Sequence, residues 1–102
     1  MNAPKSFARI IGKKRYSVAT ATLLAGDDYW DGHNWERSGR NTFLYRAPGG
    51  AYFEVDLTCW QGERDTLNPI TQEEAIDLYE GGLTEHYVKY ADAFPGVTVT
   101  DA

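Results

Sequence analysis

The sequence predicts a small α+β domain, in which an antiparallel sheet of three to five strands is covered on one face by two C-terminal helices. Two observations predict this fold. In the middle of the chain, strand-like runs are joined by a glycine- and proline-containing turn, and in the second run apolar and polar residues alternate with the period of a strand. In the last third, apolar residues recur at helical spacing behind a capping signal. The length of 102 residues fits one domain over residues 7–102, after a flexible terminus at 1–6.

The strand pattern is clearest in the middle of the chain. Residues 42–47 and 51–60 are strand-like, and the segment Pro48-Gly49-Gly50 between them is typical of a turn. In the second run one set of side chains is expected to face the core: Phe53, Val55, Leu57 and Cys59. The alternate set is expected to face water or a partner: Tyr52, Glu54, Asp56, Thr58 and Trp60.

The N-terminal segment is partly ambiguous. Residues 7–11 predict a short strand, and Gly12-Lys13-Lys14 predicts a turn. The β-branched residues in the following segment, up to Leu24, favour a second strand. Ser17 is also a suitable N-cap for a short helix, so both interpretations of residues 17–24 stay open.

Two helices are expected after residue 70. Thr71-Gln72-Glu73-Glu74 has the pattern of a capping box, and Gly81-Gly82 is a helix-ending signal. The first helix should bury Ala75, Ile76 and Tyr79. A second helix is expected from Thr84 up to Pro95-Gly96, with these side chains inward: Tyr87, Val88, Ala91 and Phe94. Residues 97–100 are expected to add a short edge strand.

Charge is distributed unevenly along the chain. The net charge is −5, yet residues 1–15 hold five lysines or arginines and no carboxylate, so residues 16–102 carry −10. A body this acidic repels phosphate backbones, which argues against direct binding to nucleic acid. Cys59 is the only cysteine, so no internal disulfide is expected. Together with the absence of an apolar signal or membrane-spanning stretch, this predicts a cytoplasmic protein that does not bind membranes.

Several short segments, taken in order, resemble a family of short uncharacterised proteins from bacterial genomes, prophages and other mobile elements. They are Lys14-Arg15-Tyr16, Thr20-Ala21, Leu44-Tyr45-Arg46, Gly50-Ala51-Tyr52-Phe53, and Ile70-Thr71 with Glu74-Ala75. The resemblance covers residues from about 14 to 80. It implies no catalytic residue and no cofactor, only an origin as a small accessory protein of a mobile genome.

An acidic helix surface is the first candidate binding site. Glu73, Asp77 and Glu80 are spaced i, i+4 and i+7, so they are expected to line one stripe, with Glu74 beside it and Glu85 soon after. Residues 70–102 hold seven carboxylates and one lysine. An acidic stripe without paired cations can take the place of nucleic-acid phosphates in the basic groove of a partner protein, although many acidic helices serve solubility alone.

The second candidate is the aromatic and acidic segment between Gly26 and Trp35. It carries the carboxylates and rings Asp27, Asp28, Asp31, Tyr29, Trp30 and Trp35. Counted from Asp27, an EF-hand would need oxygen ligands where Tyr29 stands, so that template fails, and a looser cation site stays open. Aromatic residues of these types anchor protein interfaces, and in small domains they also cover the domain's own core.

The sequence evidence for a catalytic site is weaker than that for either binding surface. Cys59 is expected on the inward face of a strand, so pairing with His33 or His86 as a nucleophile is disfavoured, and no metal-ligand spacing is present. Glu54 and Asp56, with Tyr52 and Trp60, define an alternative: a small hydrolase or carbohydrate-binding groove. A second alternative is a structural homodimer joined through the expected strand at residues 97–100.

The sequence therefore favours a non-enzymatic, cofactor-free binding module, monomeric or dimeric. We expect it to inhibit or modulate a basic protein that handles nucleic acid, in the manner of an anti-CRISPR protein. The acidic stripe and the aromatic segment are the surfaces expected to contact that partner.

Overall fold

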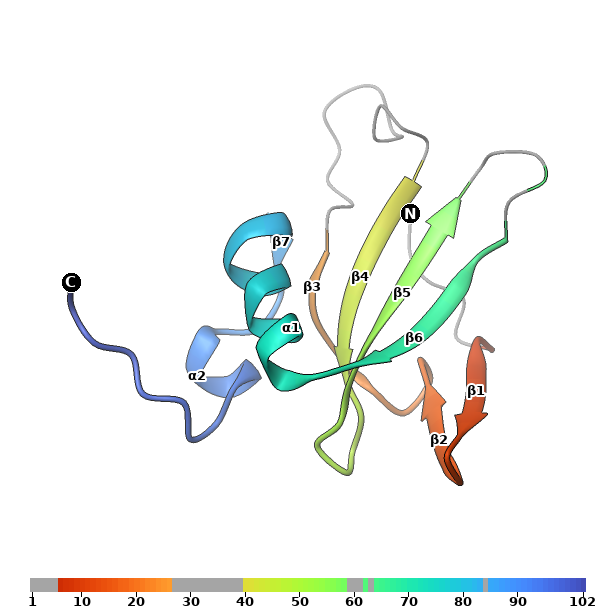
Figure 1. Cartoon of the computed structure of the whole chain (residues 1–102), viewed down its shortest axis with the longest axis horizontal. Coiled ribbons are helices and arrows are strands. Elements are labelled where there is room, and N and C mark those ends of the chain that lie inside the picture. The colour runs from red at the N-terminus through yellow and green to blue at the C-terminus, as the bar shows by residue number, and fades with distance from the viewer. Residues whose placement is uncertain (1–5, 27–39, 59–61, 63, 84) are drawn as a thin grey trace.

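The computed structural model of the chain describes residues 6–26, 40–58, 62, 64–83 and 85–102. These residues form seven strands, an α-helix that continues into a π-helix, and a second short α-helix (Figure 1). Five strands make one antiparallel sheet, and two others make a separate hairpin. The predicted class, a small α+β fold built on an antiparallel sheet, is confirmed.

The centre of the sheet is the predicted hairpin. Strand β4 (Arg40–Arg46) pairs with β5 (Tyr52–Thr58) along its whole length. The turn between them is closed by hydrogen bonds from the Gly50 amide to the Ala47 carbonyl (2.9 Å) and from the Ala47 amide to the Ala51 carbonyl (2.7 Å). Gly50 has a φ of 96°, a conformation that side chains rarely adopt, so glycine fits this turn.

The remaining strands of the sheet were not all expected. The order is β6-β5-β4-β3-β7, with β3 at Thr22–Gly26, β6 at Thr66–Ile70 and β7 at Glu85–His86. No strand was expected at residues 66–70, yet they pair with β5. Pro69 lies in this strand without disrupting the sheet because β6 is an edge, where a missing N–H is tolerated.

A separate hairpin at the N-terminus confirms the strand and turn predicted at residues 7–14. Strand β1 (Ala8–Ile11) pairs with β2 (Lys14–Ser17), and the two central turn residues, Gly12 and Lys13, have φ values of 59° and 68°. Positive φ at both positions gives the turn the twist that two-residue hairpins favour.

Residues 17–24 form neither one continuous strand nor a helix. Strand β2 ends at Ser17, the chain turns, and β3 begins at Thr22. The Ala21 amide donates to the Ser17 carbonyl (3.1 Å), which closes this turn. Both open interpretations were therefore incomplete, because a turn divides the β-branched segment into two strands of different sheets.

The first predicted helix is present with its capping box. Helix α1 (Gln72–Asp77) has Thr71 as its N-cap and continues into η1 (Leu78–Gly82), a π-helical segment. The Leu83 amide donates to the Leu78 carbonyl at 2.9 Å, the i→i+5 bond of a π-helix. Gly82 is its last residue, in agreement with the glycine stop signal.

The second predicted helix is largely wrong. Residues 85–86 form β7, which pairs with β3, and the helix α2 spans only Tyr90–Ala93. Of the four side chains expected inward, Phe94 is fully buried and Val88 half-buried, whereas Tyr87 and Ala91 are exposed. Residues 97–100 form no strand, and the chain there runs away from the body of the fold (Figure 1). None of the described helices is long and apolar enough to cross a membrane.

Each face of the sheet contributes to a separate core. One core joins Tyr16 and Val18 to the inward side chains of β4–β6, including Phe53, Val55 and Leu57, as the alternation predicted. The expected fourth member, Cys59, lies outside the described residues. The other core contains Tyr52, Tyr79 and Phe94, among residues of the sheet, η1 and α2.

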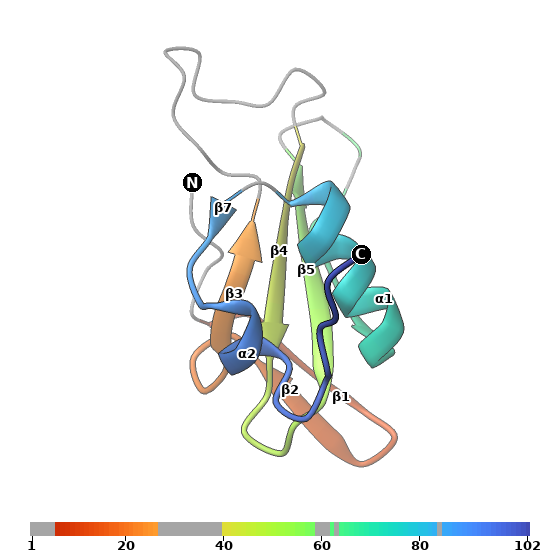
Figure 2. The ribbon, with the colours of Figure 1, turned by 90° about the vertical axis from the view of Figure 1, so that its left-hand side faces the viewer.

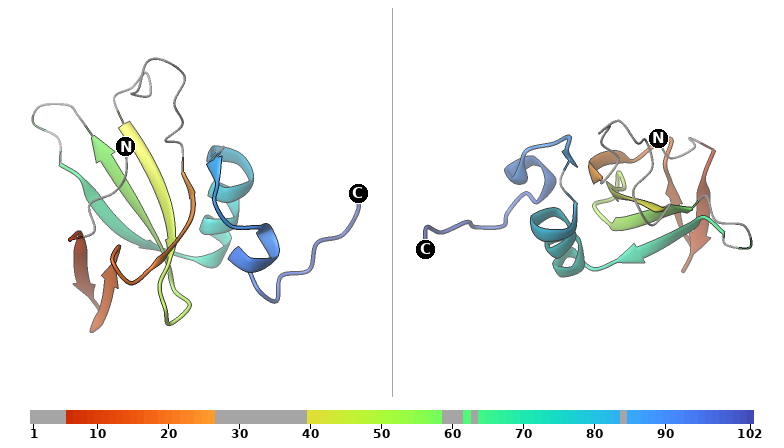
Figure 3. Two further views of the ribbon diagram at one scale, coloured as in Figure 1. Left: turned by 180° about the vertical axis from the view of Figure 1, so that it is seen from behind. Right: turned by 90° about the horizontal axis from the view of Figure 1, so that it is seen from above.

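The helical segments therefore do not cover the face predicted to be the core. They pack on the opposite face, near Tyr52. Figure 2 views the molecule from the side on which they lie, and Figure 3 shows them at the end away from the β1–β2 hairpin. The prediction that Tyr52 meets water or a partner is wrong, because this ring is 6% exposed. An alternating strand in a sheet covered on both faces buries residues from both of its sets.

Candidate functional site

The acidic side chains at the start of α1 are held by the capping box. The Glu74 carboxylate accepts hydrogen bonds from the backbone N–H and the hydroxyl of Thr71, both at 3.1 Å. The Thr71 hydroxyl oxygen accepts in turn from the Glu74 amide (3.1 Å). This reciprocal arrangement satisfies free amides of the first turn and fixes the carboxylate of Glu74. Negative charge at this end of a helix is also stabilised by the helix dipole.

Glu73 and Asp77 lie one turn apart on α1, and both side chains are exposed. Their spacing places them on the same side of the helix, as predicted from the sequence. Within the described part of the chain, neither carboxylate forms an ion pair with a lysine or arginine. These two residues are therefore the uncompensated part of the acidic stripe.

Glu80 departs from the predicted stripe. It lies in η1, where i→i+5 bonding turns the chain through a smaller angle per residue than an α-helix does. The i+7 spacing from Glu73 therefore no longer places Glu80 directly in line with Glu73 and Asp77. Its carboxylate accepts a hydrogen bond from the Tyr90 hydroxyl (2.8 Å), which raises the pKa of Tyr90 and links η1 to α2. Glu85 lies on β7 rather than on a helix, so it is a separate acidic position.

The structure brings a sheet carboxylate to the same place as the α1 carboxylates. A pocket of 430 Å³ is lined by Glu54 of β5, Glu74 and Asp77 of α1, and the apolar parts of Ile70 and Leu78. Sequence reasoning placed Glu54 and the helix acids on two different surfaces. The pocket shows that they form one, because α1 packs over the sheet face that carries Glu54.

Glu54 is the described carboxylate whose protonation is most affected by this arrangement. Burial raises its pKa, and the neighbouring charges of Asp56 and then Glu74 raise the pKa further. The pocket therefore holds a carboxyl group that resists ionisation, beside two others on α1. Such a pairing of carboxyl groups in different environments is one that acid–base catalysis uses.

The other residues of the predicted catalytic groove do not join this pocket. Asp56 does not line it and instead accepts a hydrogen bond from the Thr42 hydroxyl (2.7 Å). Tyr52 is buried, and its hydroxyl donates to the Ala93 carbonyl (2.9 Å), so it provides no exposed aromatic platform. Trp60 lies outside the described residues.

His86 has a structural role in this fold. Its ring stacks on that of Tyr79, with centroids 3.9 Å apart, and its Nε2 lies 2.7 Å from the Tyr79 carbonyl and 3.1 Å from the Leu83 carbonyl. Because both partners are acceptors, Nε2 carries the proton and donates. The ring therefore caps carbonyl groups near the end of η1.

Several predicted positions lie outside the described residues. They are the acidic and aromatic residues Asp27, Asp28, Tyr29, Trp30, Asp31, His33 and Trp35, together with Cys59. In the described part of the chain, no group of three His, Cys, Asp or Glu side chains is placed to hold a metal ion.

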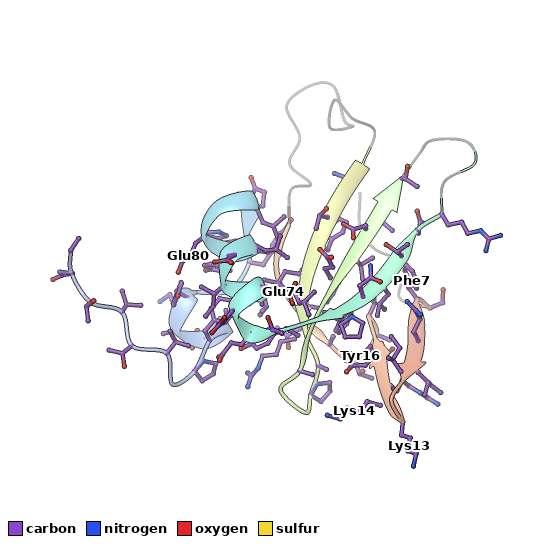
Figure 4. All side chains as sticks on the ribbon, viewed as in Figure 1. Phe7, Lys13, Lys14, Tyr16, Glu74 and Glu80 are labelled. Carbon is purple, nitrogen blue, oxygen red and sulfur yellow. The ribbon has the colours of Figure 1, made fainter. Side chains whose placement is uncertain are left out.

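The cations of the N-terminal hairpin lie away from the acidic helix. Figure 4 shows Lys13 and Lys14 at the tip of the β1–β2 hairpin and Glu74 and Glu80 on the helical segment, with the sheet between them. The Arg9 guanidinium is directed elsewhere too, since it donates to the Leu67 carbonyl of β6 (2.7 Å). The described N-terminal cations therefore do not neutralise the carboxylates of α1.

Comparisons of the chain with protein-family models, with curated proteins and with solved structures found no match.

Proposed function

We propose that the protein is an acidic binding module that engages a basic, nucleic-acid-handling protein through the carboxylates around α1. This acidic surface consists of Glu73, Glu74 and Asp77 of α1 together with Glu54 of the adjoining sheet. A nuclease complex of bacterial defence is the most specific partner, which would make the protein an anti-CRISPR-like inhibitor. That specific case rests on the resemblance to mobile-element proteins.

The separation of charge supports the proposal most directly. The acidic surface has no cation paired with it among the described residues, and the basic hairpin lies across the sheet from it. Ion pairs between the acidic surface and the hairpin cations would add stability if the charges served solubility alone. An acidic surface without ion pairs keeps its negative electrostatic potential, which can attract a basic partner.

The geometry also suits imitation of phosphate groups. Glu73 and Asp77 lie one helical turn apart, and Glu74 is held in place by Thr71, so ordering the Glu74 carboxylate on binding costs little conformational entropy. Complementary charge accelerates encounter and selects basic partners, and both effects weaken as salt screens the charges.

Affinity capture tests the proposal. Tagged protein is incubated with nuclease-treated bacterial lysate at about 50 mM and about 500 mM salt, and the bound proteins are identified by mass spectrometry. We expect basic nucleic-acid-binding proteins at low salt, their loss at high salt, and their release by heparin, a polyanion that competes for phosphate-binding grooves.

Two charge-matched variants locate the surface. Glu73→Gln/Asp77→Asn removes two charges from α1, whereas Asp92→Asn/Asp101→Asn removes the same number elsewhere. The first should reduce capture at least about fivefold and the second should leave it nearly unchanged. Equal effects of the two variants, or captured proteins with no basic character, would refute the proposal.

The pocket at Glu54 supports a second candidate function, a small hydrolase that uses Glu54 as a general acid. The raised pKa of Glu54 beside Glu74 and Asp77 is the observation in its favour. Hydrolysis of a panel of nitrophenyl glycosides and esters, abolished by Glu54→Gln, would establish it. A wild-type protein with no turnover of the panel would leave binding as the function of this pocket.

A further inference from the structure

A second pocket lies beside the β4–β5 turn, on the opposite face of the sheet from α1. It is an open pocket of 490 Å³, lined by residues of β2, of the turn that follows β2 and of the β4–β5 turn. Its lining includes Lys14, Arg15, Tyr16, Thr20, Ala47 and Ala51. Figure 4 shows Lys14 and Tyr16 on the β1–β2 hairpin, and Glu74 and Glu80 on the helical segment. Neither the acidic surface nor the proposed function uses this pocket.

The floor of the pocket is apolar and supported by the core. The Tyr16 ring is 8% exposed and meets the ring of Phe53 edge to face, with centroids 5.8 Å apart. Ala47 and Ala51 are half-buried and pack against the same core. The volume lies within the range of about 300–1,000 Å³ typical of small-molecule sites, which are mainly apolar with a few polar groups.

The walls are held by backbone hydrogen bonds, so the pocket exists without a ligand. One wall is the β4–β5 turn, closed by the bonds of Ala47 to Gly50 and Ala51. The other wall is the turn after β2, closed by the bond from Ala21 to Ser17. A pocket formed in advance binds its ligand with a smaller cost of ordering.

The charged residues that line the pocket are both cations. Lys14 and Arg15 are both exposed, and no carboxylate lines the pocket. The Tyr16 hydroxyl makes no hydrogen bond to any described residue, so it is available as a further donor. Two cations and a hydroxyl beside an apolar floor complement a ligand that is apolar at one end and anionic at the other.

We propose that this pocket binds a small organic anion, with an aromatic or aliphatic body on Tyr16, Ala47 and Ala51 and its carboxylate, sulfonate or phosphate group toward Lys14 and Arg15. A neutral apolar ligand would leave the two cations unused. A polyanion without an apolar body would leave the apolar floor unused. The ligand class therefore follows from the presence of both features in one pocket.

A pair of fluorescent probes separates the two contributions. 8-Anilinonaphthalene-1-sulfonate carries an aromatic body and one anionic group, and N-phenyl-1-naphthylamine has the same body without the sulfonate. We expect the folded protein to bind one equivalent of the anionic probe saturably, and to bind the neutral probe at least about fivefold more weakly. Salt should weaken the binding of the anionic probe alone.

Amino-acid substitutions test whether the two probes bind in this pocket. Lys14→Gln/Arg15→Gln should lower the affinity for the anionic probe about tenfold, because each exposed charge pair contributes less than about tenfold to affinity. The affinity for the neutral probe should not change. Thr20→Trp should block both probes by filling the pocket. Ala19 is the adjacent residue, also exposed but not in the lining, so Ala19→Trp should bind both probes as the wild type does.

Three results would overturn the proposal. They are the absence of a saturable site for the anionic probe, equal affinity for the two probes, and binding that survives Thr20→Trp. Circular dichroism of each variant confirms that it is folded before its affinity is compared.

Discussion

Glu54 is a residue whose pKa is raised both by burial and by neighbouring negative charges. It is half-buried on β5, and its pKa is raised first by burial and then by Asp56 and Glu74. The folded protein therefore holds a proton on Glu54 at pH values where the unfolded chain has already released it. Between the ordinary pKa of 4.5 and the raised value, the folded state binds more protons, so its stability falls as pH rises through that window.

Glu54→Gln should remove this dependence. From pH 4 to pH 7, the unfolding free energy of the variant should rise by about 0.5 kcal/mol relative to that of the wild type. The value is small because solvent screens a partly exposed group. Urea denaturation at the two pH values measures the gain. A stability difference that does not change with pH would contradict the assignment of a raised pKa to Glu54.

At the scale of elements, local signals were predicted well and non-local ones were not. The capping box at Thr71 and the hairpin turn at Pro48–Gly50 depend on neighbouring residues, and both are present as expected. Strand β6 pairs with β5, the strand before it, whereas β7 depends on pairing with β3, which is distant in sequence. Pro69 concealed the first of these strands, and a helix-like spacing of apolar residues concealed the second.

The capping box gives a matched pair of variants for the stability of α1. Thr71→Ala should lower the unfolding free energy by about 1 kcal/mol, because it leaves the Glu74 amide without its acceptor. Glu74→Gln should change it by less than about 0.5 kcal/mol, since glutamine at this position completes the same box. Chemical denaturation of both variants tests the pair, and equal losses would show that the charge of Glu74, not the box, stabilises the helix.

The hydrogen bond from Tyr52 joins α2 to the sheet. Tyr52→Phe should destabilise the protein by about 1–2 kcal/mol, because the Ala93 carbonyl loses its donor in a buried setting. Tyr45→Phe is the control, since Tyr45 is also a buried tyrosine of the sheet but lies in the other core. Thermal unfolding of the two variants measures the difference, and equal stability of Tyr52→Phe and the wild type would contradict this role.

At the scale of the whole molecule, two cores on opposite faces of one sheet separate the charges. The N-terminal hairpin packs against one face and brings its lysines with it, while α1 and η1 pack against the other and bring their carboxylates. The acidic character of α1 could be predicted from its i, i+4 spacing. The meeting of Glu54 with Glu74 and Asp77 could not, because it depends on which face of the sheet the helix covers.

The pocket beside Lys14 was likewise beyond prediction from the sequence. Its walls come from two turns about 30 residues apart, which become neighbours only when the hairpin packs on the first core. The basic N-terminal segment was recognisable, but its apolar neighbours Ala47 and Ala51 carry no functional signal of their own.

The separation of charge is the claim on which the proposed partner depends, and paramagnetic broadening by two nitroxide probes tests it most directly. The probes share one ring and differ only in carrying an ammonium or a carboxylate group. We predict that the ammonium probe broadens the amide signals of residues 72–82 more strongly, that the carboxylate probe broadens those of residues 8–17 more strongly, and that about 0.5 M salt removes both preferences. Equal broadening of residues 72–82 by the two probes at low salt would show that cations neutralise the acidic surface, and would contradict the account.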